Sequence, residues 1–221
     1  KPVDKTEWGM SPQTVNAYYS SSNNEIVFPA AILQPPFFNF NADPAVNFGG
    51  IGGVIGHEIS HGFDDSGSRF DGDGNLNNWW TESDRKNFDE KVGQLAAQYD
   101  KYEPVTGSFV NGKFTSGENI GDLGGINVAY TALQMYLKDH GNPGKISDLT
   151  QDQRFFMSWA TVWRTKSTDK YMTNQVKTDP HSPGYYRSFG PLVNMDSFQK
   201  AFDVKPGDKL YVAPEKRIKI W

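Results

Sequence analysis

The sequence predicts a mainly helical α+β domain with one small β-hairpin near its start. Several long segments carry helix-starting and helix-forming patterns, whereas residues 15–28 carry the short aromatic and β-branched pattern of paired strands. The 221 residues are 37% hydrophobic and 14% aromatic, which is typical of a folded domain with a substantial core. The net charge of −4 gives no reason to expect a nucleic acid partner. The sequence has no apolar run of about 18 residues that would span a membrane.

The hairpin is predicted from three consecutive stretches. Residues 15–19 are short and aromatic, residues 20–24 form a polar turn cluster, and residues 25–28 are rich in β-branched side chains. Pro29 and the pair Pro35 and Pro36 then end regular structure. The first strand is therefore expected to include residues 15–19.

A long helix is expected next, from Asp43 as N-cap and Pro44 in the first turn to about residue 62. Three isoleucines on one stripe of this helix are expected to face the core: Ile51, Ile55 and Ile59. Five glycines between residues 49 and 56 each cost about 1 kcal/mol in a helix. We therefore expect another backbone or a substrate to approach this surface. Further helices are expected over residues 81–101, 115–137, 152–165 and 169–175.

The helix over residues 43–62 carries two histidines, His57 and His61, that stand four residues apart. At 3.6 residues per turn both imidazoles lie on one face and can bind one metal ion. Glu58 directly follows the first histidine and can reach a water on that metal. This pattern is typical of zinc proteases, in which two histidines hold zinc and the glutamate is the general base. The alternative is an amphipathic helix whose histidines merely face solvent.

A catalytic zinc needs three protein ligands and an open position for water. Because the chain has no Cys, the third ligand must be His181, His140 or a carboxylate. Glu118 is the best carboxylate candidate, because a helix N-terminus presents it rigidly and Asp122 one turn later could support a ligand histidine. The alternative for Glu118 is a capping box with Thr115, in which its side chain bonds only a backbone N–H.

Five blocks of the sequence resemble, in the same order, the neprilysin and endothelin-converting-enzyme family of zinc metallopeptidases, including its bacterial oligopeptidases. The blocks are residues 15–19, 27–38, 57–65, 117–125 and 181–187. The resemblance implies a zincin-like, thermolysin-like catalytic domain with one Zn²⁺ per chain. It also implies that residues 1–221 are the C-terminal part of that domain, and that the family's N-terminal part, a partner for this one, is absent. The lack of Cys is similar to bacterial members.

The resemblance assigns the chemistry residue by residue. His57, His61 and Glu118 would bind zinc. Glu58 would be the general base acting on the zinc-bound water. Asp122 would orient a ligand histidine, His57 rather than His61.

The resemblance also implies how a peptide would bind. His181 would stabilise the oxyanion, and Arg187 would bind a substrate carbonyl on the primed side. Asn16 and Ala17 would hold the substrate backbone as an added strand. Four residues would form the hydrophobic pocket for the residue after the scissile bond: Ile32, Phe37, Val54 and Trp163. The alternative for these four is ordinary core packing.

Two positions depart from the family's pattern. Gly121 stands where the family more often has Ala, and it is expected to face away from the metal. Gly53 occupies a pocket position often filled by a larger residue, so the pocket is expected to be roomier.

The implied function is a zinc-dependent endopeptidase that cleaves peptides on the amino side of hydrophobic residues. The alternative is a zinc-binding fragment that is inactive without its N-terminal part. A zinc aminopeptidase ranks lower, because nothing in the sequence resembles an acidic site for a free amine. A bacterial periplasmic or secreted location and a cytoplasmic one are both compatible, since disulfide-free proteins occur inside and outside cells.

Overall fold

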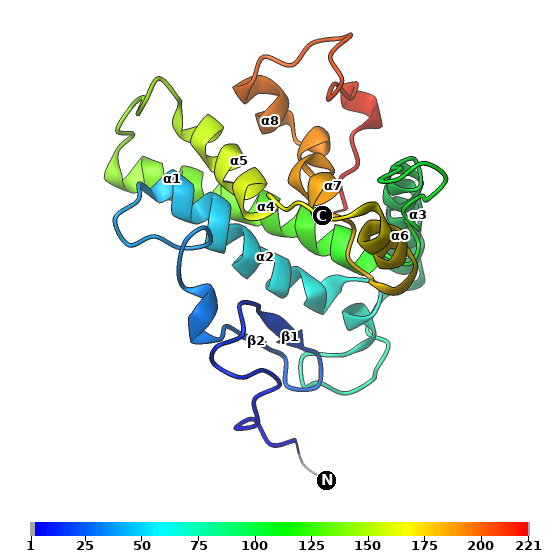
Figure 1. The fold of residues 1–221 in the computed structure, drawn as a ribbon. Coiled ribbons are helices and arrows are strands. Elements are labelled where there is room, and N and C mark those ends of the chain that lie inside the picture. Colours follow the sequence, from blue (N-terminus) through cyan, green and yellow to red (C-terminus); the bar gives the residue numbers. More distant parts are fainter. Residues whose placement is uncertain (1–2, 221) are drawn as a thin grey trace.

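Two long helical segments cross at the centre of the molecule, and the other elements pack around them (Figure 1). The computed structural model describes residues 3–220. The strands are β1 (Tyr18–Ser20) and β2 (Glu25–Val27). The α-helices are α1 (Pro44–Asn47), α2 (Gly53–Ser60), α3 (Glu82–Tyr99), α4 (Ser116–His140), α5 (Gln151–Val162), α6 (Asp169–Thr178), α7 (Gly184–Phe189) and α8 (Asp196–Ala201). This mainly helical α+β architecture confirms the predicted fold class.

The first of the two central segments is helical from residue 44 to residue 63. A π-helical turn, Phe48–Gly52, joins α1 to α2, and the 3-10 turn His61–Phe63 follows α2. Asp43 is the N-cap, as predicted, because its side chain accepts a hydrogen bond from the backbone N–H of Ala45 at 3.1 Å. A π-turn inside a helix is rare and often occurs at functional sites.

The isoleucine stripe of this segment does not face the core as predicted. Ile51 is buried, but Ile55 and Ile59 are 39% and 43% exposed. The face of α2 that packs on α4 carries glycines and His57 instead. Glycines allow the two backbones to come closer than isoleucines would, so the buried face follows the small residues rather than the large apolar ones.

The contact between α2 and α4 is made by backbone atoms. A Cβ on Gly56 would lie 2.5 Å from the carbonyl oxygen of Gly125, and a Cβ on Gly125 would lie 2.3 Å from the backbone N of His57. Real Cβ contacts are not this short, so the crossing requires glycine at both positions. This confirms the expected close approach of another backbone. It also places the first turn of α4, with Glu118, beside the two histidines of the metal motif.

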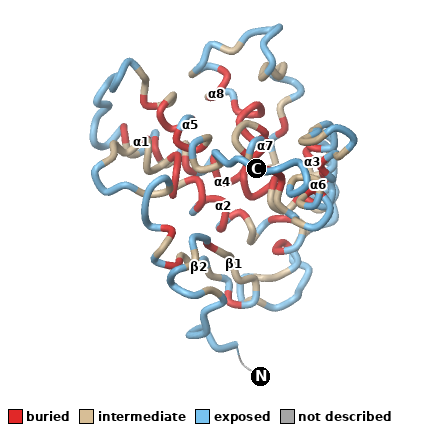
Figure 2. The backbone as a smooth tube through the Cα atoms, viewed as in Figure 1, coloured by how far each residue is buried: buried red, intermediate tan, exposed pale blue. Residues whose placement is uncertain are grey.

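Two hydrophobic cores hold α4 in this position, and the buried residues concentrate along α2, α4 and α5 (Figure 2). One core packs Ile126 and Leu133 against Phe155, Phe156 and Trp159 of α5. The other packs α4 against α3 and α7, and its members include Ile120, Leu123, Leu95, Tyr99 and Tyr186. Because α4 is buried on both sides, its N-terminal turn is a rigid support for a site.

The hairpin lies beside α2, and its strands are shorter than expected. The strands are antiparallel with Tyr18 opposite Val27. Continuing this register would place Asn16 opposite Pro29, which has no backbone N–H to donate. Asn16 and Ala17 therefore precede β1 rather than belong to it. A third small core packs Ala17 with Val54 of α2 and fixes the hairpin next to the helix.

The helices α3 to α6 agree with the predictions to within a few residues, whereas α7 and α8 were not predicted. α3 lies within the predicted 81–101, α4 extends three residues past 137, α5 ends before 165, and α6 continues to Thr178. Among residues 3–220, no helix combines the length and apolar character that crossing a membrane requires.

Candidate active site

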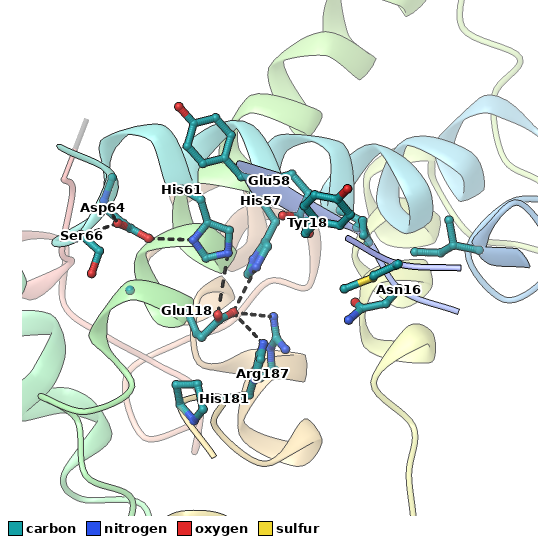
Figure 3. A pocket seen from close by; sticks show the side chains of 18 of the residues that line it. Asn16, Tyr18, His57, Glu58, His61, Asp64, Ser66, Glu118, His181 and Arg187 are labelled. Carbon is teal, nitrogen blue, oxygen red and sulfur yellow. Dashed lines mark hydrogen bonds and ion pairs between the residues drawn. The ribbon is translucent and has the colours of Figure 1, made fainter. Parts of the chain in front are cut away.

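A cleft of about 610 Å³ opens between the hairpin, α2, the N-terminal turn of α4 and the segment leading into α7. All site residues predicted from the sequence line this cleft except Asp122, which is fully buried behind His57. Figure 3 shows the histidines, Glu118 and Arg187 converging on one point of the cleft. The fold therefore brings together residues that are up to 171 positions apart, from Asn16 to Arg187.

His57, His61 and Glu118 form the one group of potential metal ligands found among the described residues. One ligand atom from each lies within 4.8 Å of the others. His57 Nε2 is 3.2 Å from Glu118 Oε2, and His61 Nε2 is 3.8 Å from Glu118 Oε1. His140, another candidate for the third ligand, lies at the opposite end of α4 and stacks on Tyr136.

These three residues fit a zinc ion. Ligand atoms about 2.0–2.1 Å from a tetrahedral zinc are about 3.3 Å apart, which is close to the separations seen here. Oε2 of Glu118 is buried and has no well-aligned hydrogen bond, although two imidazole nitrogens lie near it. A buried carboxylate oxygen without a partner is costly, and a cation between it and the histidines would satisfy it.

Glu118 is not used as a helix cap. Thr115 makes no side-chain capping bond, and its hydroxyl donates instead to the carbonyl of Asn111 at 3.0 Å. The capping-box alternative is therefore wrong, and the Glu118 side chain extends toward the histidines.

Each of the two motif histidines is held from behind by an aspartate. Asp122 Oδ1 lies 2.9 Å from His57 Nδ1, and Asp64 Oδ2 lies 2.7 Å from His61 Nδ1. The other oxygen of Asp64 accepts hydrogen bonds from the backbone N–H groups of Ser66 and Gly67. Contacts of this kind turn the Nε2 atoms of both rings toward the cleft and raise their basicity as ligands.

The electrostatics of the group favour an added positive charge. Burial opposes ionisation of Glu118, but the neighbouring His181 and His57 imidazoles and Arg187 hold its pKa far below the ordinary value. Burial alone would lower the pKa of His57, yet the Asp122 and Glu118 carboxylates raise it to about 9. A proton or a metal cation can supply the charge, and the ring geometry described above suits a metal.

Glu58 lies on the wall of the cleft next to this group and is only 5% exposed. Burial raises its pKa above the ordinary 4.5, while the neighbouring His57 and His61 partly counteract that effect. A carboxylate with a raised pKa beside a metal site is suited to accept a proton near neutral pH.

His181 reaches the group from the loop before α7. Its Nε2 is 3.1 Å from Glu118 Oε2, and its Nδ1 is 2.7 Å from Asp179 Oδ1. Asp179 also accepts a hydrogen bond from the backbone N–H of His181, so this carboxylate fixes the ring orientation. Nε2 therefore faces the cleft.

Arg187 is buried and paired on one side. Its Nε and one terminal nitrogen donate to the two oxygens of Asp122 at 2.8 and 2.7 Å, and its guanidinium stacks 3.7 Å from the ring centre of Trp163. The backbone carbonyl of Arg187 accepts a hydrogen bond from the indole of Trp159. Because Arg187 lines the cleft, its remaining N–H groups are placed for an acceptor there.

The four predicted pocket residues are both core and lining. Ile32 and Val54 are buried with Phe37 in the small core beneath the hairpin, and Trp163 packs edge-on against Trp159. All four also line the cleft. Core packing is thus observed for these side chains, and because they also line the cleft, their role as a pocket for a substrate side chain stays a prediction.

Both predictions about unusual glycines are wrong. A Cβ on Gly121 would lie 2.8 Å from the imidazole of His57, so Gly121 faces the metal-site histidine rather than away from it. A Cβ on Gly53 would lie 2.8 Å from the ring of Trp159. The space beside Gly53 is filled by that indole, so it adds no room to the pocket.

Two aspartates of the site were missed from the sequence. Asp64 follows His61 by three residues and Asp179 precedes His181 by two. These short spacings to a histidine are a weak signal, because a carboxylate at this distance can reach the outer ring nitrogen but is also common in turns.

Comparisons with known proteins agree with this geometry. The model of Peptidase family M13 matches residues 16–218. Human neprilysin is 45% identical over 225 residues, which cover 99% of this chain and 30% of neprilysin. The neutral endopeptidase of Lactococcus lactis subsp. lactis (strain IL1403) is 46% identical over 219 residues, which cover 99% of this chain and 33% of that protein.

A solved structure supports the same assignment. The Mycobacterium tuberculosis zinc metalloprotease Zmp1 in complex with an inhibitor superposes with a TM-score of 0.96 at 52% identity, covering 100% of this chain and 34% of that one. The chain thus spans about a third of the length of the relatives it matches. The predicted family resemblance is confirmed, and the chain belongs to peptidase family M13.

Proposed function

We propose that this chain carries the catalytic site of a zinc-dependent endopeptidase that cleaves peptides on the amino side of hydrophobic residues. The observation that carries the proposal is the convergence of His57, His61 and Glu118 within 4.8 Å, with Glu58 beside them on the same cleft. A zinc bound by these three would act as a Lewis acid that lowers the pKa of a water to about 7 and polarises the scissile carbonyl.

The residues of the chain then have separate tasks. Glu58 accepts a proton from the attacking water and delivers it to the leaving amine. His181, with Nδ1 held by Asp179, presents Nε2 to the developing oxyanion in its protonated form. Asp122 and Asp64 keep the two ligand imidazoles in place.

Substrate binding uses the walls of the cleft. The backbone at Asn16 and Ala17, which precedes β1, can hold an extended peptide by main-chain hydrogen bonds. Arg187 offers N–H groups to a carbonyl on the primed side. Ile32, Phe37, Val54 and Trp163 form an apolar wall, which supports a preference for a hydrophobic residue after the scissile bond.

The direct test replaces the base. Glu58→Gln keeps the size of the side chain and removes its ability to accept the proton. We expect the zinc content to stay at one per chain and the turnover number to fall by roughly 10²–10⁴-fold or more. Metal analysis and a fluorogenic peptide assay measure the two quantities. Unchanged turnover would show that another group is the base.

The pH dependence gives a second test. The active form of Glu58 is the carboxylate, and burial raises its pKa above 4.5. Activity is therefore lost as the pH falls through this raised pKa, and the acid limb of kcat/KM should lie above pH 4.5. Zinc content measured at each pH separates protonation of Glu58 from loss of the metal. An acid limb at or below pH 4.5 with zinc retained contradicts the assignment.

The alternative function is a zinc-binding module that needs the rest of a longer protein for activity. The observation in its favour is that the chain covers only about a third of its relatives. Assaying the isolated chain and the longer protein with the same fluorogenic peptide distinguishes the two, because only the longer protein would cleave it under the alternative.

A further inference from the structure

Two structural connections run side by side from the N-terminal turn of α4 to the loop over residues 179–183. In the cleft, Glu118 Oε2 lies 3.1 Å from His181 Nε2. Directly behind it, the hydroxyl of Ser182 donates to the side-chain oxygen of Asn119 at 2.9 Å. The first connection joins residues with proposed chemical roles. The second joins their immediate neighbours in the sequence and has no role in the mechanism above.

The second connection is buried and continues into the helix. Asn119, Ser182 and Thr115 are each 1% exposed. The amide of Asn119 donates to the hydroxyl of Thr115 at 2.9 Å, and that hydroxyl donates to the carbonyl of Asn111 at 3.0 Å. Each side-chain oxygen and nitrogen of these three residues thus has a hydrogen-bond partner, and the direction of each bond in this network is fixed. A fully satisfied buried network of this kind specifies one arrangement of the groups it joins.

The loop has few other connections to α4. Among the described residues, the bond from Ser182 to Asn119 is the one hydrogen bond between residues 179–183 and α4 besides the contact of His181 with Glu118. Asp179 holds the His181 ring, but Asp179 belongs to the same loop, so it fixes the ring relative to the loop and not relative to the metal ligands. The position of the loop against Glu118 therefore depends on Ser182 and Asn119.

We propose that Asn119 and Ser182 are a positioning pair that sets the distance of the His181 imidazole from the metal-ligand end of α4. The pair touches neither substrate nor metal and acts through His181. The proposal rests on the peptidase function proposed above, because the task of His181 is to meet a developing oxyanion. A displacement of such a group by about 1 Å can cost about 100-fold in rate.

The test uses Ser182→Ala in the full-length, zinc-loaded enzyme. We expect kcat to fall by about 10–100-fold, with KM and zinc content little changed. Ser182→Cys keeps a side chain of similar size with a weak hydrogen-bond donor, so its kcat should fall less than that of Ser182→Ala. If the alanine variant does not fold, the cysteine variant is used for the test. Ser158→Ala is the matched control. Ser158 is also buried, and its hydroxyl joins α5 to the carbonyl of Val46 in α1 at 2.6 Å, away from the His181 loop.

A double-mutant cycle separates positioning from general stability. If Ser182 acts through His181, adding Ser182→Ala to His181→Ala should change kcat by less than about twofold. Equal losses in both backgrounds, or an equal loss in Ser158→Ala, overturn the proposal.

A readout independent of activity is the crystal structure of Ser182→Ala. We expect His181 Nε2 to leave hydrogen-bond distance of Glu118, and an unmoved imidazole overturns the proposal. A wild-type enzyme that cleaves no peptide would refute the peptidase function. An active wild type with an unmoved ring would refute only the positioning pair.

Discussion

The crossing of α2 and α4 and the edge of the hairpin both line the same cleft, but they are built in opposite ways. At the crossing, backbones touch at Gly56 and Gly125, and the charged groups are buried and paired, with Asp122 fully covered. At the edge, each strand of the hairpin has only three residues. Asn16, which precedes β1, is exposed and lies outside the sheet. The cleft therefore combines a rigid wall of packed helices with a wall formed by a short hairpin that has no further partner strand in the described structure.

The difference matches the role proposed for each wall. Metal ligands need a fixed geometry, and packed helices with satisfied buried charges supply it. A peptide that can vary in sequence needs main-chain partners, and an unpaired backbone edge supplies those without reading side chains. Substitutions at the crossing should therefore affect stability and metal binding together, whereas substitutions at the edge should affect substrate binding alone.

The largest effect is expected at Asp122. Asp122→Ala removes the partner of both His57 and the buried Arg187 guanidinium. We expect the free energy of unfolding to fall by about 3–5 kcal/mol, because a buried charge is left unpaired. Zinc affinity should fall about 10–100-fold. Denaturant unfolding and a competitive chelator titration measure the two.

The control for Asp122 is an exposed aspartate. Asp196 pairs with Arg217 and Lys219, and its side chain is 60% exposed. Asp196→Ala should cost no more than about 1 kcal/mol. Equal destabilisation by the two substitutions would show that the buried charges at the crossing contribute no more to stability than a surface ion pair.

A smaller loss of stability is expected from Gly125→Ala, which tests the backbone contact itself. The added methyl would lie 2.3 Å from the backbone N of His57, so the helices must separate. We expect the free energy of unfolding to fall by roughly 1–3 kcal/mol or more and the zinc content to fall with it. Gly93→Ala is the control, because nothing lies within 4 Å of that site in α3, and it should stabilise the helix by about 1 kcal/mol. Full zinc content in Gly125→Ala would contradict the rigid-wall account.

The smallest effect is expected at the hairpin edge. Asn16→Ala removes one polar side chain from the cleft. KM should rise by about 2–10-fold, the equivalent of one hydrogen bond, with unfolding and zinc content unchanged. Asn41→Ala, at an exposed asparagine elsewhere, should leave all three quantities unchanged. A loss of zinc in Asn16→Ala would show that the two walls are not independent.

At the crossing, the sequence predicted the positions of the two histidines correctly, but it did not predict which face of α2 is buried. The spacing of His57 and His61 fixes them on one helical face whatever the rest of the fold does. The isoleucine stripe led to a wrong prediction of the buried face of α2. The helix packs on the glycine face of α4, about 70 residues away, and periodicity within one helix does not reveal that partner. The orientation of Gly121 failed for the same reason, since the imidazole it faces belongs to the other helix.

At the edge, the sequence predicted that a hairpin forms but not where pairing starts. Register decides that Asn16 falls opposite Pro29, and register follows from the turn geometry rather than from strand propensity. Asp64 and Asp179 were missed because short-range carboxylates are common in turns, and only the folded structure shows which of them reach a ring nitrogen.

The most direct test of the metal site is the X-ray absorption spectrum at the zinc edge of the purified, metal-loaded protein. The proposed ligand set predicts one zinc per chain with nitrogen and oxygen ligands at about 2.0–2.1 Å. It also predicts outer-shell scattering from two imidazoles, those of His57 and His61, and the loss of one oxygen ligand in Glu118→Ala. Scattering from three imidazoles, or a first shell unchanged in Glu118→Ala, would contradict it.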